Sequence, residues 1–425
     1  MSIDYAARRS RIAPALGLSD EIFLAGAGSP LPKPEISDAM LPFIAHQEYY
    51  YLAGHAEAHG GIIAYDAKTL EWTSFVPEVT EMDRVWDGAE QLPGELLANF
   101  PAWLAARKGR KIANLGAPIA GVSADEALTN RVRDALRHAR RPKEQGEIEL
   151  MKRAAVATAE GYAAVQPFLV PGVSERRMQI EMEAGFFRGG GDKTGYDTII
   201  GVAAQAAVFH GSPSTQRIAK AGDFILIDAG AQVERYVIDV TRTYVAGGNP
   251  SGFQRDLYAA VKNAHARACA KCVNGAEWKD IHFGAATDML GSLIDMGLMK
   301  GNASSLVEQD AHMLFYPHGV GHMVGLGVRD GSGLEPGRTK DPRPCLKSLR
   351  MDLVLRPGYT VTIEPGLYMI PALINDPARR EKYRDAVNWT MAEQYLHVGG
   401  VRLEDNLIVT DGAPINLTAS IPQAF

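Results

Sequence analysis

Four β-rich apolar runs in the second half of this chain each contain an embedded acidic residue, and in the last run Asp405 follows it. The runs are FILIDAG (224–230), YVIDVTRTYV (236–245), TVTIEPGLYMI (360–370) and GVRLEDNLIVT (400–410), and the residues are Asp228, Asp239, Glu364 and Glu404. One acidic residue in a strand ordinarily faces solvent, but four embedded in this way favour a shared, partly buried region. Like charges at a buried position cost free energy unless a cation or a proton neutralises them. The pattern therefore predicts a polar centre inside a β-rich fold.

The first two of these runs predict two strands that fold back on each other. If the chain turns around Val233 and Glu234, Asp228 and Asp239 are directly opposed, with Cβ atoms about 5 Å apart on one face. No Asn-Gly or Asp-Gly pair marks the turn. The alternative is that the turn lies elsewhere and that both are ordinary strand-end aspartates.

The run HGVGHMVGLGVRD (318–330) places His318 and His322 four residues apart. Histidines at this spacing bind zinc on helices in which a glutamate follows the first histidine. Here Gly319 follows it, and each glycine of the run would destabilise a helix by about 1 kcal/mol relative to alanine. We therefore expect extended or looped backbone that lets another segment or a ligand come close. Two structural histidines near a turn are the alternative.

One histidine and the four carboxylates together form a set of hard oxygen ligands with one imidazole. Such a set suits Mn²⁺ and, less selectively, Co²⁺, Fe²⁺ or Zn²⁺. Four carboxylates offset the charge of two divalent ions, so the sequence predicts a two-metal site.

Composition argues against several functional classes. The chain of 425 residues has a net charge of −6 and no basic block, which disfavours a nucleic-acid partner. No apolar run reaches the roughly 20 residues of a membrane helix, and no apolar segment follows the arginines of MSIDYAARRSRI. We therefore expect a cytoplasmic protein with no nucleic-acid or membrane partner. Cys269, Cys272 and Cys345 are too few for a disulfide framework and are expected to be reduced thiols.

The chain is predicted to divide near Pro142, into domains 1–142 and 143–425. The first part contains the strand-like runs IFLAGAG (22–28), YYYLAG (49–54), GGIIAYD (60–66) and TSFVPEV (73–79). The second part starts with a helix from about Glu147 and continues with helices and strands in blocks rather than in regular βαβ units. This order predicts an α+β fold. RGGGDKTG (188–195) lacks the spacing of a phosphate-binding loop and is expected to be a turn.

The order Asp228, Asp239, His322, Glu364 and Glu404, in the contexts IDAG, DVTRTY, HGVGH, EPGLY and RLEDN, resembles the metallopeptidases of the pita-bread fold. Among them the pattern is most similar to prolidase (Xaa-Pro dipeptidase) and aminopeptidase P. In the first part, FIAHQEYYYLAGH, FVPEV and WDG resemble the N-terminal domain of the same proteins. The resemblance implies a C-terminal pita-bread (creatinase/aminopeptidase-like) domain, a smaller α/β N-terminal domain involved in substrate capping and dimerisation, and a homodimer.

The resemblance also implies a role for each ligand. Asp228 holds one metal ion, Asp239 and Glu404 bridge both ions, and His322 and Glu364 hold the second.

Four residues are implied to act on the substrate. Glu364 is the candidate proton shuttle, and His318 and His210 resemble the non-ligand histidines of the family, either of which is a candidate for stabilising the oxyanion. Tyr196, in TGYDTIIG, resembles a pocket residue.

Three arginines are further candidates for substrate binding. Arg329 stands where the family usually has another substrate-contacting histidine; its planar fork suits a carboxylate, and the alternative is a catalytically silent pair with Asp330. Arg350 resembles the arginine with which prolidases of higher organisms hold the C-terminal carboxylate of a dipeptide, and the alternative is a plain surface arginine. Arg402 shares a strand face with Glu404 and is expected to orient that carboxylate.

We therefore expect metal-dependent hydrolysis of small Xaa-Pro peptides, foremost dipeptides, with Xaa-Pro aminopeptidase activity on longer peptides as the alternative. The same fold hosts organophosphate hydrolysis, a C–S lyase, a metal-free creatinase and partner-recruiting proteins, so the fold alone leaves these functions open. The presence of all five ligands disfavours a metal-free enzyme and a pure binding protein.

Overall fold

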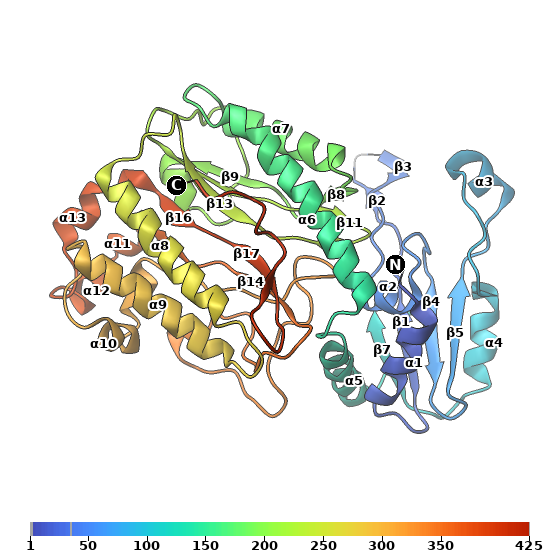
Figure 1. Ribbon diagram of the computed structural model, residues 1–425. Coiled ribbons are helices and arrows are strands. Elements are labelled where there is room, and N and C mark those ends of the chain that lie inside the picture. Colours follow the sequence, from blue (N-terminus) through green and yellow to red (C-terminus); the bar gives the residue numbers. More distant parts are fainter. Residues whose placement is uncertain (1–2, 35, 425) are drawn as a thin grey trace. The chain divides into compact units, whose positions relative to one another are not determined.

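The computed structural model describes residues 3–34 and 36–424, and it divides between Arg140 and Arg141 into two compact units (Figure 1). We call them the N-terminal unit and the C-terminal unit. Within the described ranges, no helix combines the length and the apolar character that a membrane span requires.

The N-terminal unit is built on a mixed sheet of five strands in the order β6-β5-β4-β1-β7. β1 pairs with β4, and β4 with β5, in antiparallel fashion, whereas β1 with β7 and β5 with β6 are parallel. Leu24, Ala64 and Phe75 from three of these strands pack with Phe100 in a buried cluster. The strands are β1 (Ile22–Gly26), β4 (Ile62–Asp66), β5 (Glu71–Val76), β6 (Glu95–Leu96) and β7 (Ile112–Gly116).

The strand predicted for YYYLAG (49–54) is wrong, because this run lies in helix α2 (Gln47–Ala53). Its last five residues are all buried, and the helix ends at Gly54, which adopts the left-handed conformation (φ 79°) that favours glycine. A short apolar run reports burial, and a buried helix produces the same run as a buried strand. The other helices of this unit are α1 (Tyr5–Ala15), α3 (Glu81–Asp87), α4 (Phe100–Ala105) and α5 (Glu126–Ala139), and a small hairpin consists of β2 (Pro32–Lys33) and β3 (Ile36–Met40).

The C-terminal unit carries two pairs of long helices on short antiparallel sheets, which confirms the predicted α+β class (Figure 1). α6 and α7 pack against each other and on β9, β11 and β12, whereas α8 packs against α9 and on β14, β15 and β16. The first helix starts near the predicted Glu147, with a capping box between Glu144 and Glu147. The four helices are α6 (Gln145–Val165), α7 (Glu175–Arg188), α8 (Gly252–Ala270) and α9 (Trp278–Asp295).

The strands of this unit form small sheets in the orders β13-β10-β9, β12-β11-β8, β14-β17-β18 and β15-β16. The strands are β8 (Lys193–Thr194), β9 (Ile199–Val202), β10 (Phe224–Asp228), β11 (Ala231–Val233), β12 (Tyr236–Val237), β13 (Thr241–Val245), β14 (Thr360–Ile363), β15 (Gly366–Tyr368), β16 (Gly400–Arg402), β17 (Asp405–Ile408) and β18 (Ile415–Asn416). Shorter helices connect them: α10 (Ala303–Glu308), α11 (Pro371–Ile374), α12 (Pro377–Lys382) and α13 (Trp389–Gln394).

The predicted direct opposition of Asp228 and Asp239 is wrong by two residues. The turn of the hairpin is formed by Glu234 and Arg235, both at positive φ (47° and 70°), and Asp228 of β10 pairs with Thr241. A two-residue turn with two positive φ values matches the twist of the flanking strands. Because the error is two residues, Asp239 stays on the same face as Asp228, as its diagonal neighbour.

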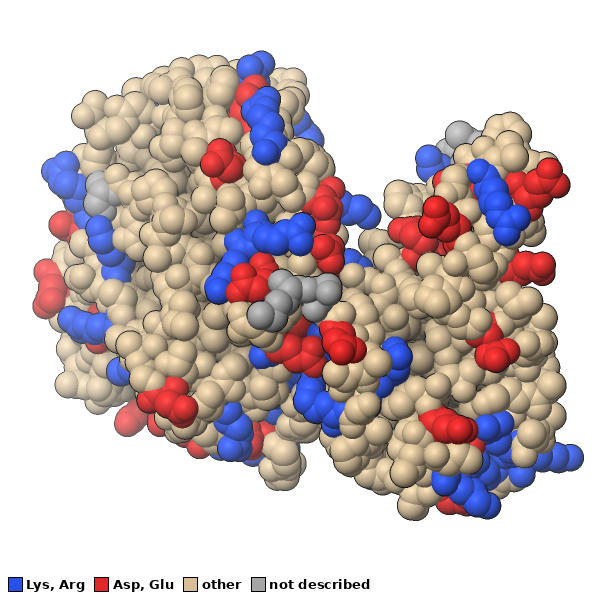
Figure 2. Space-filling model, turned by 45° about the vertical axis from the view of Figure 1, so that its right-hand side comes forward, with Lys and Arg blue, Asp and Glu red and all other residues tan. Residues whose placement is uncertain are grey.

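The surface shows no extended field of one charge on the face drawn in Figure 2. Lysine and arginine side chains alternate there with aspartate and glutamate. The three cysteines form no disulfide, and Cys269 lies in α8 while Cys272 follows its end.

Candidate metal centre

Each of the four embedded carboxylates lies where a strand ends or is interrupted. Asp228 is the last residue of β10, and Asp239 lies between β12 and β13. Glu364 separates β14 from β15, and Glu404 separates β16 from β17. The backbone therefore leaves the regular ladder at the positions where these side chains have to converge.

The HGVGH run lies beside β14 as an irregular strand, which confirms that it is not helical. The N–H groups of Thr362 and Glu364 donate to the carbonyls of His322 and Val320, each at 2.8 Å. His322 therefore faces Thr362, and Glu364 lies diagonally from His322 on the same face. This pairing also requires close backbones, since a Cβ at Gly321 would lie 2.1 Å from the carbonyl oxygen of Thr362.

Glu404 joins the two halves of the site. Ile363 pairs with Asp405 and Gly366 with Arg402, so the same register places Glu364 opposite Glu404. On its other side, Glu404 forms a bridge with Thr241, whose hydroxyl donates to Glu404 Oε2 at 2.8 Å. Segments that are far apart in sequence are thereby aligned by backbone hydrogen bonds.

Three of the predicted ligands converge closely enough for one cation. One ligand atom each from Asp239, His322 and Glu404 lies within 4.8 Å of the other two, and all three residues are buried. His322 Nε2 lies 3.3 Å from Asp239 Oδ2 and 3.8 Å from Glu364 Oε1. Glu404 Oε1 is buried without a hydrogen-bond partner among the described residues. A buried oxygen without a donor, beside a carboxylate and an imidazole, fits a divalent cation.

Asp228 lies beside this group and is held by two donors. Arg402 Nη2 donates to Asp228 Oδ2 at 2.5 Å, and the hydroxyl of Tyr196 donates to Oδ1 at 2.8 Å. Arg402 directly contacts the carboxylate of Asp228, and it is linked to Glu404, the carboxylate that it is expected to orient, through the hydroxyl of Thr241. Its other donors point to Thr241 Oγ1 (2.9 Å) and the Tyr368 hydroxyl (3.1 Å), so this buried arginine is a positioning residue.

Crowding of carboxylates in a dry cavity shifts their pKa values. Burial, opposed by the charge of Arg402 and reinforced by that of Asp239, raises the pKa of Asp228 to about 7. Burial and the charge of Asp239 raise the pKa of Glu404 well above its usual range. Burial also acts on Asp239, but the hydrogen bond from His322 and the imidazole charge outweigh it and lower the pKa of Asp239. A divalent cation is the partner that keeps such carboxylates ionised together.

His318 lies next to the ligands, but both of its ring nitrogens are engaged. Tyr368 accepts a hydrogen bond from Arg402 and donates its own hydrogen to His318 Nε2, 2.8 Å away. Nδ1 therefore carries the ring hydrogen and donates to the carbonyl of Gly319 at 2.9 Å. Burial lowers the pKa of His318, which favours this neutral form.

The predicted substrate residues other than Tyr196 line one cavity of about 500 Å³ together with the predicted ligands. His210, Arg329 and Arg350 are exposed, and they lie at this cavity together with the buried ligands. Asp330, the alternative partner of Arg329, forms a buried ion pair with Lys143 at 3.2 Å. Tyr196 lies at an adjoining cavity that shares Asp228, Asp239 and His210 with the first.

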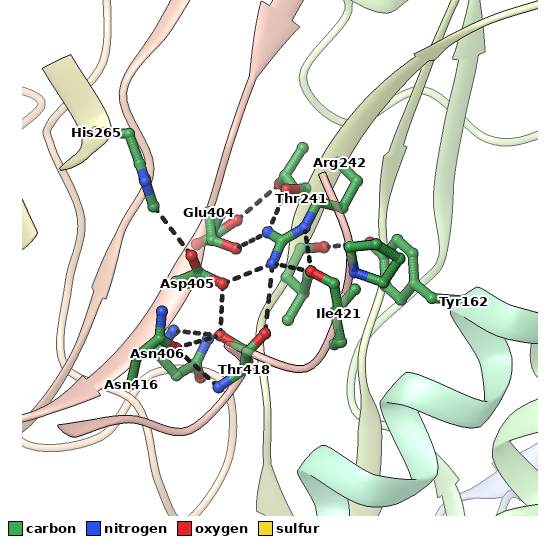
Figure 3. A network of polar contacts seen from close by, with 12 residues as sticks. Tyr162, Thr241, Arg242, His265, Glu404, Asp405, Asn406, Asn416, Thr418 and Ile421 are labelled. Carbon is green, nitrogen blue, oxygen red and sulfur yellow. Dashed lines mark hydrogen bonds and ion pairs between the residues drawn. The ribbon is translucent and has the colours of Figure 1, made fainter. Parts of the chain in front are cut away.

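A buried polar network behind Glu404 holds the backbone in place (Figure 3). Arg242 of β13 donates to the carbonyls of Glu404 (2.7 Å) and Ile421 (2.9 Å) and to Asp405 Oδ1 (2.7 Å). The hydroxyl of Thr418 also donates to Asp405 Oδ1, at 2.6 Å. The C-terminal segment is thus tied to the site.

The side chain of Asn406 acts on the neighbouring ligand. Its Oδ1 accepts the N–H of Asp239 at 3.1 Å, and its amide donates to the carbonyl of the same residue.

Sequence reasoning did not single out Thr241, Tyr368, Arg242 or Asn406. Thr241 lies two residues after Asp239, so strand alternation already placed it on the ligand face. Arg242 stands inside the apolar run DVTRTYV, where an unpaired charge is costly, and this was a usable signal. Tyr368 and Asn406 gave none, because their role depends on strand pairings.

Comparison with known proteins places this geometry in a family context. Residues 149–411 match the model of metallopeptidase family M24. A protein of Paracoccidioides brasiliensis (strain Pb03) named "Probable Xaa-Pro aminopeptidase PEPP" is 27% identical over 410 residues, which cover 91% of this chain and 87% of that protein. The Xaa-Pro dipeptidase of Stenotrophomonas maltophilia (strain K279a) is 34% identical over 276 residues, or 64% of this chain and 61% of its own.

Solved structures share the fold along the whole chain. Aminopeptidase PepP of Pseudomonas aeruginosa superposes with a TM-score of 0.77 at 22% identity, covering 100% of this chain and 96% of its own. A variant of Escherichia coli aminopeptidase P reaches a TM-score of 0.80 at 21% identity, covering 100% and 97%. At these identities the likeness establishes the fold, with its pita-bread domain.

The close packing at Gly321 leads to a stability prediction. Gly321→Ala places a methyl group against the carbonyl of Thr362 at a φ of 154°, so we expect the free energy of unfolding to fall by about 2 kcal/mol or more. Gly291→Ala is the control, because this α9 glycine has open space around it and alanine favours a helix by up to about 1 kcal/mol. Urea unfolding of both variants measures the difference. Equal midpoints for Gly321→Ala and the unaltered chain would contradict the packing argument.

Proposed function

The chain belongs to metallopeptidase family M24, and on that premise we propose that it hydrolyses Xaa-Pro peptide bonds with two divalent metal ions, foremost in dipeptides. The observation that carries the proposal is the convergence of Asp239, His322 and Glu404 in a cavity that Asp228 and Glu364 also line. Relatives named Xaa-Pro aminopeptidase and Xaa-Pro dipeptidase support the choice of substrate bond.

Asp228, Asp239, His322, Glu364 and Glu404 would hold the ions, in the roles that the family resemblance implies: Asp228 toward one ion, His322 and Glu364 toward the other, and Asp239 and Glu404 shared between them. Four carboxylates and one imidazole favour Mn²⁺, with Co²⁺, Fe²⁺ and Zn²⁺ as weaker candidates. When bound, the ions polarise the scissile carbonyl and lower the pKa of the attacking water.

Glu364 is the proposed proton shuttle. Glu364 lies at the cavity with 19% of its side chain exposed, which makes it more accessible than the carboxylates of Asp239 and Glu404. It takes a proton from the attacking water and delivers it to the leaving nitrogen. An amide nitrogen leaves as the amine only once it is protonated, so expulsion of the product amine depends on such a donor.

His210 is the proposed donor to the developing oxyanion. It is exposed at both adjoining cavities, whereas the two nitrogens of His318 are engaged by Tyr368 and Gly319. We assign His318 to shaping the cavity wall against the substrate. Tyr196 and Arg402 position Asp228 and thereby the ion that it holds.

Arg350 and Arg329 are the proposed partners of the substrate carboxylate. Arg350 is exposed at the cavity and has no hydrogen-bond or ion-pair partner among the described residues. Aminopeptidase activity on longer peptides is the second candidate, supported by relatives of that name that match about nine-tenths of the chain.

We further assign residues 1–142 to an N-terminal aminopeptidase P-like domain and 143–425 to the catalytic domain. Three cysteines without a disulfide favour the reducing cytoplasm as the location.

Peptide length separates the two candidate activities. Mn²⁺-loaded protein is incubated with Ala-Pro, Ala-Pro-Ala and, as a control without proline, Ala-Ala, and released amino acids are quantified. We expect Ala-Pro to be cleaved and Ala-Pro-Ala to be a much poorer substrate. Equal or faster cleavage of Ala-Pro-Ala would assign the chain as an aminopeptidase. Failure to cleave either proline peptide while metal is bound would reject the Xaa-Pro proposal.

Glu364→Gln tests the shuttle, because the amide keeps an oxygen ligand but does not carry a proton. We expect turnover of Ala-Pro to fall by about 100-fold or more while bound metal is retained. Glu381→Gln is the matched control, since Glu381 is 75% exposed and forms only a surface ion pair. Elemental analysis of both variants separates loss of metal from loss of proton transfer. Near-normal turnover in metal-loaded Glu364→Gln contradicts the role.

We also propose a homodimer that uses an apolar face of α3. Met82, Val85 and Trp86 are 62%, 73% and 76% exposed, and their spacing places them on one face of the helix. Trp86→Asp is expected to shift sedimentation toward the monomer mass of 46.0 kDa. Leu70→Asp changes an equally exposed leucine (72%) at the opposite end of β5 and should leave the dimer intact. A purely monomeric unaltered chain contradicts the proposal.

A further inference from the structure

We infer that the cavity selects peptide substrates that carry at least two negative charges. This inference rests on the proposed Xaa-Pro hydrolysis and specifies its substrate class: Xaa-Pro peptides with an acidic side chain in addition to the terminal carboxylate. The observation behind it is a set of cations on one segment of the cavity wall, Lys340, Lys347 and Arg350.

The segment that carries these cations packs directly on the site. A Cβ at Gly319 would lie 3.3 Å from the side chain of Leu349 and 3.5 Å from the carbonyl of Ser348. The backbone of 348–349 is therefore in contact with the residue after His318. Lys347 and Arg350 flank this contact, so their charges lie at the mouth above the ligands.

The cations that line the cavity differ from their neighbours in sequence. Arg338 pairs with Glu277 and Asp352 at 2.8 and 2.7 Å, and Arg343 pairs with Asp310 at 2.8 Å. In the described part of the chain, by contrast, the side chains of Lys340, Lys347 and Arg350 form neither an ion pair nor a hydrogen bond. The acidic residues near this segment thus form ion pairs with Arg338 and Arg343, which do not line the cavity.

The acidic groups of the cavity do not balance these charges. Asp228 is already paired with Arg402, and the remaining carboxylates converge on the position of the metal. Divalent ions bound there would neutralise the carboxylates, which leaves Lys340, Lys347 and Arg350 in excess. A cleft lined by one sign of charge concentrates ligands of the opposite sign. Ala-Pro has only one carboxylate. In a peptide with a second acidic group, that group meets the cations that the first carboxylate leaves without a partner.

Isosteric peptide pairs provide the test. The full Mn²⁺-loaded chain is assayed with Ala-Pro-Glu against Ala-Pro-Gln, and with Glu-Pro against freshly dissolved Gln-Pro. We expect at least one acidic peptide to have the higher kcat/KM by about five-fold, the upper end of the effect of one exposed ion pair. Because the interaction is screened, the preference should shrink as salt rises from about 0.05 to about 0.5 M.

Charge-neutral variants locate the effect. In Lys340→Gln/Lys347→Gln the acidic preference should disappear. Lys220→Gln/Lys300→Gln removes two equally exposed lysines outside the cavity and should keep it. Preferences within about two-fold for both pairs, or a preference that survives in Lys340→Gln/Lys347→Gln, overturn the inference.

A binding measurement separates this inference from the proposed activity. Calorimetric titration of the full chain with Pro-Glu and with Pro-Gln needs no turnover. Tighter binding of Pro-Glu that depends on Lys340 and Lys347 supports the anionic subsite even if no Xaa-Pro peptide is cleaved. Equal binding of the two peptides, with Ala-Pro still hydrolysed, rejects the subsite and retains the enzyme.

Discussion

Mutual repulsion among four carboxylates in one buried cavity is the constraint on which the C-terminal unit depends. A fold that gathers Asp228, Asp239, Glu364 and Glu404 has to supply compensating charge or lose stability. The chain supplies part of it itself, through the contacts of Arg402 with Asp228 and of His322 with Asp239. Among the described residues, Glu404 Oε1 has no donor, and burial raises the pKa of this group. A divalent cation beside Glu404 would supply the positive charge that is still missing. The structural constraint and the proposed chemistry therefore have the same origin.

Strand register is what converts this constraint into geometry. The ligand side chains come from β10, the loop before β13, the HGVGH run and the interruptions at Glu364 and Glu404, and backbone pairing aligns all of them. A slip of one residue in any pairing would turn a ligand away from the cavity. The buried contacts of Arg242 with the carbonyls of Glu404 and Ile421 oppose such a slip (Figure 3). The Asn406 amide does the same for Asp239. Hydrogen bonds to buried backbone thus position the ligands as much as the ligands' own contacts do.

Two kinds of positive charge surround this centre, and they differ in exposure. Arg402 is buried, and its three side-chain nitrogens donate to Thr241, Tyr368 and Asp228. It therefore positions these side chains rather than binding the substrate. Lys347 and Arg350 are exposed at the mouth, where the side chains remain available to an incoming ligand. A catalytic metallopeptidase core and a selective entrance are therefore built from different parts of the chain, since the core needs rigid strands and the entrance lies on the segment before β14.

The sequence by itself determined the set of candidate ligands, because each of these residues stands out against its own neighbours. An acidic residue inside an apolar run, or a histidine pair in a glycine-rich run that excludes a helix, is a local signal. The tertiary structure decided which groups touch. It placed Asp228 opposite Thr241 instead of Asp239, made a helix of Tyr49–Ala53, and put Arg402 in direct contact with Asp228 and in contact with Glu404 through Thr241. It also brought Lys340 and Lys347 to the cavity, although nothing in their local sequence distinguishes them from other surface lysines. The reason is physical: periodicity and composition report burial along one segment, whereas register, turn position and pairing depend on packing between segments that are distant in sequence.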